Sequence, residues 1–158
     1  MKTVSNTTPI ISLSAIGKIE ILRDLFREII IPQAVYEEIK AKKGVGYHSV
    51  DSNFIKVQPI QTKNHELLLS DRLDLGEAET IILAKEITAD NVIIDENLGY
   101  IVAKEYNLNV IRTLSILLKA KEENIISEVK PLIEEMISKG RWYSKRVYYS
   151  FLEKAGEK

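Results

Sequence analysis

One stretch decides the fold: residues 75–97, which read LGEAETIILAKEITADNVIIDEN. In its first half the apolar residues Ala78, Ile81 and Ile82 recur at spacings of three and four without a proline, which predicts a helix with one apolar face. In its second half, residues 91–94 are mainly branched and apolar, with no polar alternation. Such a run is typical of a strand that is covered on both faces in a parallel sheet. The stretch therefore predicts a helix that leads into a buried parallel strand.

Carboxylates stand at the ends of both predicted elements. Glu77 and Glu79 open the helix, and Asp95 follows the strand. At 3.6 residues per turn Glu77 lies about 80° from the centre of the apolar face and Glu79 about 120°, so Glu77 should lean toward the core while Glu79 points to solvent. Asp95 falls beyond the carboxyl end of its strand, where functional groups gather in open α/β sheets. The alternative role for Asp95 is a cap on the helix expected near Asn97.

Strand and helix signals alternate along the rest of the chain. We expect strands at residues 2–5, 29–31, 54–57, 91–94 and 109–112. We expect helices at residues 9–16, 19–26, 32–39, 65–70, 76–84, 98–104, 113–122 and 126–137. Pro131 falls inside the last of these and either kinks the helix or marks its start. The alternation predicts an α/β three-layer sandwich with a largely parallel central sheet.

Length and composition bound the class of protein. With 158 residues, 45% apolar and 28% charged, the chain suits a single globular domain, with a core at about residues 1–122 and a C-terminal extension at about residues 123–158. The absence of cysteine excludes disulfides, thiolate metal sites and thiol nucleophiles. No apolar run approaches the roughly 20 residues of a membrane span, and Met1 leads directly into a folded pattern, so we expect a cytoplasmic protein.

Contact with nucleic acid would need a local basic patch, because the formal net charge is −1. The best candidate is residues 139–146, where basic residues are interleaved with Trp142 and Tyr143. The basic residues are Lys139, Arg141, Lys145 and Arg146. Basic groups beside aromatic faces suit single-stranded nucleic acid. The alternative, which we favour, is that these aromatic side chains pack on the domain or on the second subunit of a homodimer while the charges stay solvated.

Four polar residues fall just past a strand or in the helix that follows one. They are Asn6, Glu38, Glu77 and Asp95. A parallel sheet would bring all four to the same edge. Carboxylates without cysteine or histidine suit a hard cation such as Mg²⁺ or Mn²⁺, which would also relieve their mutual repulsion. For Glu38 the alternative is a plain position at the rim of its helix.

Four segments, taken in order over roughly the first 120 residues, resemble a PIN domain. They are residues 5–9 (SNTTP), 31–39 (IPQAVYEEI), 75–79 (LGEAE) and 93–96 (IIDE). More narrowly, the chain is similar to a prokaryotic PIN-like subfamily of uncharacterised proteins. The resemblance implies a metal-dependent ribonuclease, and many PIN domains are VapC-type toxins of toxin–antitoxin pairs. RNA, an antitoxin protein and a bound Mg²⁺ or Mn²⁺ are therefore the expected partners and cofactor.

The resemblance also assigns residues. It places Asn6, Glu38, Glu77 and Asp95 at the acidic positions of the family, and Thr7 where a hydroxyl often lies near the metal. Asn6 departs from the pattern, since it keeps an oxygen ligand but lacks the charge of the usual aspartate, which should weaken Mg²⁺ binding. We expect RNA to contact Thr7, Arg112, Arg141, Lys145 and Arg146.

Two functions follow from these residues. The leading one is an endoribonuclease in which Asp95 and Glu77 bind the metal, Glu38 binds metal or orients water, and Asn6 makes a neutral contact. The alternative is a catalytically weakened PIN-like module that binds nucleic acid or a protein. A phosphoacceptor receiver domain is disfavoured, because the first strand ends in Asn6 and the last in Arg112 instead of an acid and a lysine.

Overall fold

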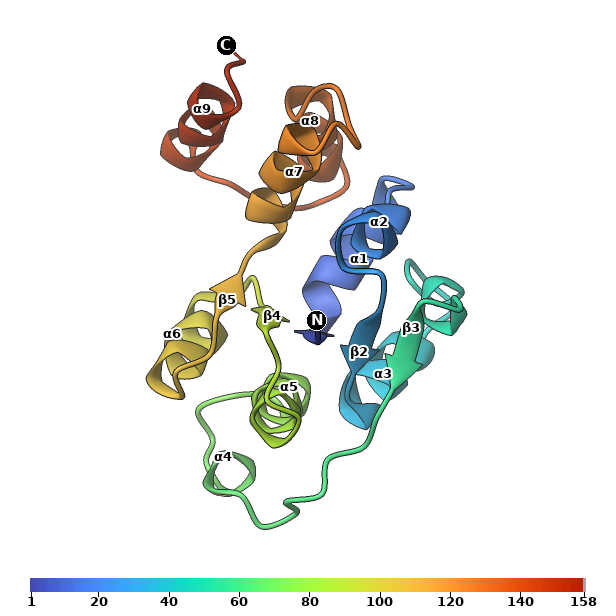
Figure 1. The fold of residues 1–158 in the computed structure, drawn as a ribbon, viewed down its shortest axis with the longest axis vertical. Helices are drawn as coiled ribbons and strands as arrows, with labels where there is room; N and C mark the ends of the chain where they lie inside the picture. Colours follow the sequence, from blue (N-terminus) through green and yellow to red (C-terminus); the bar gives the residue numbers. More distant parts are fainter. Residues whose placement is uncertain (158) are drawn as a thin grey trace.

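The computed structural model describes residues 1–157, and a parallel five-stranded sheet runs through its centre (Figure 1). The strand order is β3-β2-β1-β4-β5, and every neighbouring pair is parallel. In the central strand Val4 lies opposite Ile30 on one side and Val92 on the other. The strands are β1 (Thr3–Ser5), β2 (Ile29–Ile31), β3 (Ile55–Val57), β4 (Asn91–Ile93) and β5 (Val110–Ile111). The predicted parallel sheet is confirmed.

Helices connect the strands and cover both faces of the sheet. They are α1 (Thr7–Ala15), α2 (Glu20–Phe26), α3 (Gln33–Lys40), α4 (Glu66–Leu69), α5 (Leu75–Glu86), α6 (Asn97–Glu105), α7 (Thr113–Glu122), α8 (Lys130–Ser138) and α9 (Lys145–Lys154), with a short 3₁₀ turn η1 (Ser49–Asp51) after α3. Most begin and end within a few residues of the bounds expected from the sequence.

Two apolar clusters form the core, one on each face of the sheet. Alternate strand residues point to opposite faces, so Ile29 and Ile31 pack with α1, α2, α7 and α8 while Ile30 packs with α5 and α6. In β4 and just after it, Ile93 joins the first cluster, whereas Val92 and Ile94 join the second. A sheet buried on both faces explains why its strands are apolar without alternation. The three-layer sandwich is confirmed.

The C-terminal extension differs most from the sequence expectation. The helix predicted at residues 126–137 is shorter in the structure, because α8 begins at Lys130 with Pro131 in its first turn, where a missing N–H costs nothing. Of the two roles predicted for Pro131, it marks the start of the helix. A further helix, α9, follows and had not been predicted from residue periodicity. Ser144 begins it, since its hydroxyl accepts a hydrogen bond of 3.1 Å from the backbone N–H of Val147.

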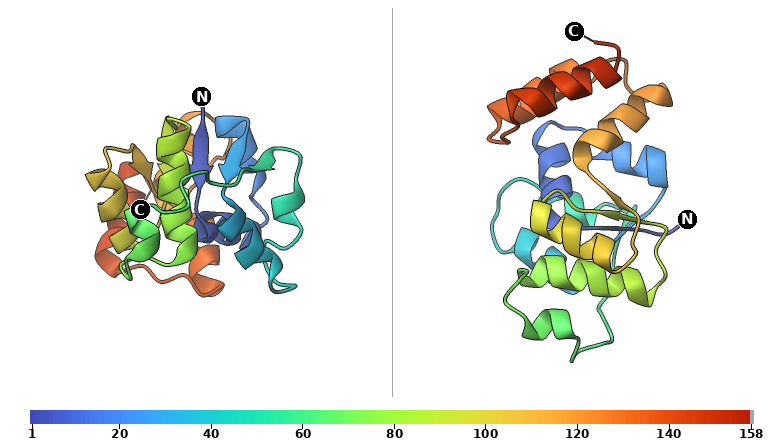
Figure 2. Two further views of the ribbon diagram at one scale, coloured as in Figure 1. Left: turned by 90° about the horizontal axis from the view of Figure 1, so that it is seen from below. Right: turned by 90° about the vertical axis from the view of Figure 1, so that its left-hand side faces the viewer.

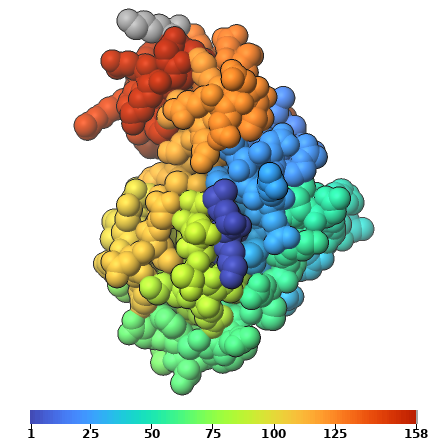
Figure 3. Space-filling model, viewed as in Figure 1, coloured from blue at the N-terminus to red at the C-terminus, as the bar shows by residue number. Residues whose placement is uncertain are grey.

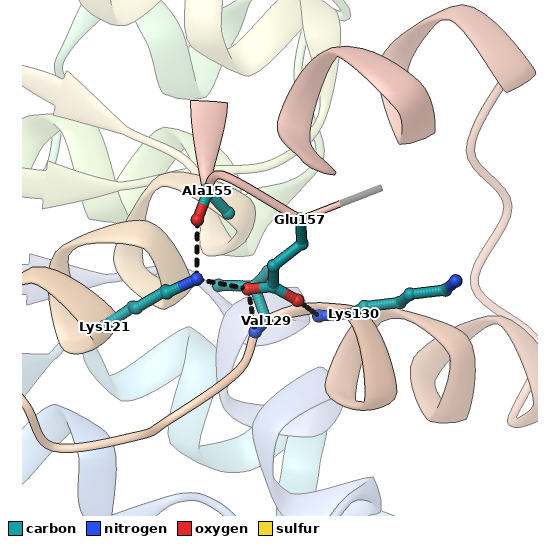
Figure 4. A network of polar contacts seen from close by, with 5 residues as sticks. All are labelled: Lys121, Val129, Lys130, Ala155 and Glu157. Carbon is teal, nitrogen blue, oxygen red and sulfur yellow. Dashed lines mark hydrogen bonds and ion pairs between the residues drawn. The ribbon is translucent and has the colours of Figure 1, made fainter. Parts of the chain in front are cut away.

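The last described residue closes the extension on itself (Figure 4). The carboxylate of Glu157 accepts hydrogen bonds of 2.8 Å from the backbone N–H groups of Val129 and Lys130, at the start of α8. It also pairs with Lys121 Nζ at 2.8 Å, from the end of α7. Burial raises the pKa of Glu157, but these hydrogen bonds outweigh it and leave the pKa below its ordinary value. Glu157 therefore joins α7, α8 and the end of α9; we call this group the Glu157 clamp.

Helices α7, α8 and α9 lie at one end of the molecule and α4 at the other (Figures 1 and 2). In the space-filling view the orange segments of the C-terminal extension lie directly against the N-terminal helices in blue (Figure 3). The extension is therefore packed onto the sandwich. Among residues 1–157, none of the helices has the length and apolar character needed to cross a membrane.

Candidate active site

The loops after β1 and β4 lie side by side, because these two strands are neighbours in the sheet. Ser5 pairs with Ile93, and the backbone N–H of Asn6 donates a 3.0 Å hydrogen bond to the carbonyl oxygen of Ile93. Asn6 and Asp95 thus follow adjacent strands at the carboxyl edge of the sheet. This is the edge where ligands bind in open α/β folds.

Asp95 is almost covered, with 6% of its side chain exposed. One carboxylate oxygen accepts a 2.8 Å hydrogen bond from the backbone N–H of Thr113, and the other a 2.7 Å bond from the Thr113 hydroxyl. Arg141 Nη2 lies 3.7 Å away. Burial raises the pKa of Asp95 above its ordinary value, although the bonds from Thr113 and the charge of Arg141 act in the opposite direction.

The contacts of Asp95 exclude its alternative role as the cap of the helix that begins at Asn97. Glu96, not Asp95, occupies the cap position of α6, and no side chain caps that helix. Asp95 instead holds the first residue of α7, which brings the start of that helix to the carboxyl edge of the sheet.

Glu77 is buried in the first turn of α5, with 8% of the residue exposed. It forms a reciprocal cap with Asp74: the backbone N–H of Glu77 donates to Asp74 Oδ1 at 2.8 Å, and the backbone N–H of Asp74 donates to Glu77 Oε1 at 3.3 Å. Burial, and then repulsion by the carboxylate of Asp74, raise the pKa of Glu77 to about 7, and Glu96 adds to the repulsion. Glu77 is thus a buried acid among like charges.

A glycine makes room for this carboxylate. A Cβ atom placed on Gly99, in the first turn of α6, would lie 2.7 Å from Glu77 Oε2 and 2.9 Å from Ile94 Cγ2. Both distances are shorter than contacts between real side chains, so α6 can approach Glu77 this closely only with glycine at position 99.

Asn6 reaches the same helix start. A Cβ placed on Gly76 would lie 3.5 Å from Asn6 Oδ1 and 3.6 Å from Asp74 Oδ1. The side chain of Asn6 is buried and does not cap α1, although Asn6 stands at the cap position of that helix. The Thr7 hydroxyl is buried without a hydrogen-bond partner among residues 1–157. Pro9 is the third residue of α1, although the sequence predicted that it would be the first.

Two further glutamates were weighed from the sequence. Glu38 is exposed on α3. Glu79 was expected to point to solvent, but its Oε1 accepts a 3.0 Å hydrogen bond from the backbone N–H of Ala34 and so holds the start of α3. The structure describes Glu38 at the rim of its helix, which agrees with the alternative weighed for it.

Glu96 is a site residue that sequence reasoning missed. It accepts a hydrogen bond from the Thr8 hydroxyl, and its charge raises the pKa of both Glu77 and Asp95. The charge of Glu96 therefore repels both carboxylates. The only signal in the sequence was its place directly after Asp95.

The donor atoms at this edge suit a hard cation. Among residues 1–157, no three or more His, Cys, Asp or Glu side chains are grouped closely enough to hold a metal. Mg²⁺ does not need such a group, because it usually keeps several waters and binds one or two carboxylates. Glu77 or Asp95, with the amide oxygen of Asn6, offers this kind of site. The like charges that raise the pKa of Glu77 are what a cation would neutralise.

A cavity of about 390 Å³ lies between this edge and the C-terminal extension. We call it the edge pocket; its lining includes Asp95, Glu96, Arg112, Arg141, Trp142 and Tyr143. Arg112 is held in place, since its Nη1 donates a 3.0 Å hydrogen bond to Asn97 Oδ1 and its guanidinium lies 4.3 Å from the ring centre of Tyr100. Lys145 and Arg146, also predicted to contact RNA, are exposed in the first turn of α9 and do not line the edge pocket.

Comparison with known proteins gives one family. A family model described as a PIN domain matches residues 2–157, which include the C-terminal extension. Searches of the curated proteins and of the solved structures gave no match. The parallel sheet, the loops after β1 and β4 and the matched residues agree with the resemblance carried by the short sequence segments. The chain therefore belongs to the PIN domain family.

Proposed function

We propose that this protein is a divalent-metal-dependent endoribonuclease of the PIN type. Membership of the family gives the chain a nuclease-type fold. The observation that carries the activity is the buried carboxylate of Glu77, whose pKa is raised to about 7 by burial and by neighbouring acids at the carboxyl edge of the sheet. Strongly perturbed acids gather at catalytic sites because the chemistry requires them there.

The proposed roles follow the positions of the side chains. Glu77 and Asp95 would hold a Mg²⁺ or Mn²⁺ ion, and Asn6 Oδ1 would add a neutral contact. When bound, the cation activates a water and screens the charge on the phosphate oxygens. Thr113 fixes the Asp95 carboxylate through two hydrogen bonds, and Gly99 leaves space for Glu77. Glu38, exposed on α3, is assigned to orienting the attacking water.

The first test is cleavage of a single-stranded RNA pool in Mg²⁺, in Mn²⁺ and in chelator. Asp95→Asn should lose nearly all activity, while the amide oxygen can still accept from Thr113, so the fold is preserved. Asp90→Asn is the matched control, because Asp90 is exposed at the opposite end of β4 and its carboxylate accepts a hydrogen bond from the backbone N–H of Lys2. Undiminished cutting by Asp95→Asn would remove Asp95 from the mechanism.

Asn6 favours a second candidate function, a weakened PIN module that binds nucleic acid or a protein. The neutral amide lies where the family usually has an aspartate, so the cation loses one charge of attraction. Asn6→Asp discriminates between the two functions. If only this variant cuts RNA, the wild-type protein is a binding module; if the wild-type protein cuts as well, the amide is sufficient.

The proposed function implies two partners. RNA is the substrate, and an antitoxin protein is the expected partner if the chain is a VapC-type toxin. A homodimer is a further proposal, and light scattering of the purified chain would decide it. A monomeric mass across a range of protein concentrations would exclude the homodimer.

A further inference from the structure

We propose that the edge pocket binds one unpaired base of the RNA, with the indole of Trp142 as its stacking surface. The proposal rests on the proposed ribonuclease function and names the form of RNA that the site accepts. The aromatic side chains of residues 139–146 suit contact with single-stranded nucleic acid, although the sequence interpretation favoured packing for them.

The exposure of Trp142 is the first observation. It lies between α8 and α9 and is 80% exposed, whereas its neighbour Tyr143 and Phe151 of α9 are partly buried against the first core cluster. Packing therefore explains Tyr143 and Phe151, as the favoured sequence interpretation expected, but it does not explain Trp142. An exposed indole at the wall of a cavity offers a flat face to a base.

The charges around the edge pocket are the second observation. Arg112 and Arg141 line the pocket, and Lys145 and Arg146 are exposed at the adjacent start of α9. Arg112 is fixed by Asn97 and by the ring of Tyr100, so its guanidinium is ordered before any ligand binds. Cations beside an aromatic face match the phosphate and the base of a single strand. A duplex offers no free base to the indole, so the occupant is single-stranded RNA.

The third observation is that the edge pocket reaches the proposed catalytic residues at the carboxyl edge of the sheet. Asp95 and Glu96 line the pocket together with Trp142. The carboxylate of Asp95 is covered by Thr113 and Arg141, so its charge is partly neutralised on the side of the extension. A base stacked on Trp142 would hold its own phosphate group near the edge where the proposed cleavage takes place.

Stacking on Trp142 predicts a preference among the bases. Asn97 Oδ1 already accepts a hydrogen bond from Arg112, and the Ser144 hydroxyl accepts one from Val147 in the cap of α9. The Asn97 amide N–H groups and the Ser144 O–H remain able to donate to a base. Stacking favours bases with a larger face, so an oligoadenylate should bind more tightly than an oligouridylate of the same length.

Trp142 reports on its own site, because it is the only tryptophan in the chain. We would titrate the full chain with a short single-stranded oligoadenylate in chelator, where binding is measured without cleavage, and follow indole fluorescence. Quenching by the single strand, and little by a blunt RNA duplex of the same length, is expected. No change in fluorescence on addition of an RNA that binds by anisotropy would overturn the proposal.

Two variants complete the test. Trp142→Leu should bind fluorescein-labelled oligoadenylate about ten-fold more weakly, because one stacked base is lost. Tyr149→Leu is the matched control, since Tyr149 is an exposed aromatic residue of α9 outside the edge pocket, and it should bind as the wild type does. Equal loss in both variants, or in neither, would contradict the proposal.

The readouts separate the two proposals. Suppose that RNA quenches the indole fluorescence and that Trp142→Leu binds RNA about ten-fold more weakly, but that the wild-type protein cleaves RNA in no metal. The ribonuclease proposal would then be wrong, and the base-pocket proposal would be supported. Cleavage that Trp142→Leu leaves unchanged in both kcat and KM would leave the ribonuclease and overturn the base pocket. Absence of RNA binding by the wild-type chain would also overturn it and would favour a protein partner for this face.

Discussion

At the scale of single residues, Gly99 determines how closely α6 can approach the buried carboxylate of Glu77. We predict that Gly99→Ala lowers the free energy of unfolding by about 1–3 kcal/mol, because the new methyl group overlaps Glu77 Oε2 and Ile94 Cγ2. The rate of RNA cleavage by Gly99→Ala should fall as well, because the new methyl group displaces the carboxylate of Glu77. Thermal unfolding followed by circular dichroism measures the change in stability.

Gly76→Ala is the control for Gly99→Ala. Gly76 also lies in the first turn of a helix, but a Cβ there would meet its neighbours at 3.5 Å or more, which is ordinary van der Waals contact. Alanine should be neutral or slightly stabilising at position 76, because it favours the helix. Equal losses at positions 76 and 99 would show that loss of glycine, and not the clash with Glu77, causes the effect.

Glu77 should make stability depend on metal and pH. Its pKa is raised from 4.5 to about 7, so without metal the folded protein holds this proton more tightly than the unfolded chain does. Its contribution to stability is then fully present below about pH 4.5 and is lost as the pH rises through about 7. In chelator at pH 8, Glu77→Gln should be more stable than the wild type by about 1–3 kcal/mol.

Added Mg²⁺ should offset that difference. The wild type gains about 2.7 kcal/mol when the ion is present at a hundred times its dissociation constant, whereas Glu77→Gln gains much less because it lacks the charge. Thermal melts in chelator and in Mg²⁺ measure both effects. Equal stabilisation of the two proteins by Mg²⁺ would remove Glu77 from the metal site.

The sequence predicted individual residues well where one element decides their environment. The helical wheel placed Glu77 at the buried edge of α5, and the structure agrees. The same wheel failed for Glu79, because a hydrogen bond to Ala34 on another helix fixes it. Arg141 beside Asp95 joins residues far apart in the chain, and no local pattern contains that information.

At the scale of elements, the Glu157 clamp holds the C-terminal extension together. We predict that Glu157→Gln lowers the free energy of unfolding by about 1–2 kcal/mol at pH 7, because the charge-assisted bonds to Lys121 and the start of α8 become weaker. For a chain of this length that is a fall in Tm of about 2–8 °C. Thermal unfolding at pH 7 measures the loss.

The pH dependence gives the clamp a second test. The pKa of Glu157 lies below its ordinary 4.5, so its stabilisation is present above that value and is lost as the pH falls through the lowered pKa. The gap between the wild type and Glu157→Gln should therefore close in acid. Glu153→Gln is the control, since Glu153 is exposed on α9, and its melting curve should match the wild type at every pH.

Most elements were predictable because their signals are local. Apolar runs gave the strands, and the 113–122 helix was predicted at the bounds that α7 has. Helix α9 was missed because its sequence mixes charged and aromatic residues and buries only Leu152 completely. Which face of α9 is buried can be identified only from its contacts with α7 and the rest of the extension.

At the scale of the whole molecule, the alternation of strands and helices was enough to predict three layers around a parallel sheet. That alternation could not predict the strand order or the place of the extension, because both depend on contacts between segments that are distant in the sequence. Val129, Ile133 and Met136 lie in the same cluster as Ile10, Leu13 and Leu117. The extension therefore completes the core on one face of the sheet, although the sequence separates it from the strands and helices that it covers.

Truncation tests how far the core depends on that extension. A chain ending at Glu122 should fail to fold cooperatively, since it loses three fully buried side chains of α8 and its entry, Val129, Ile133 and Met136. At about 1.5–3 kcal/mol for each, the loss approaches the whole stability of a domain, about 5–15 kcal/mol. A chain ending at Lys139 keeps α8 and should fold with a lower Tm, because it loses α9, the Glu157 clamp and the segment with Arg141 and Tyr143. Cooperative melting of the shorter chain, at a Tm equal to that of the longer one, would show that residues 1–122 are a complete core and that α8 is only attached to it.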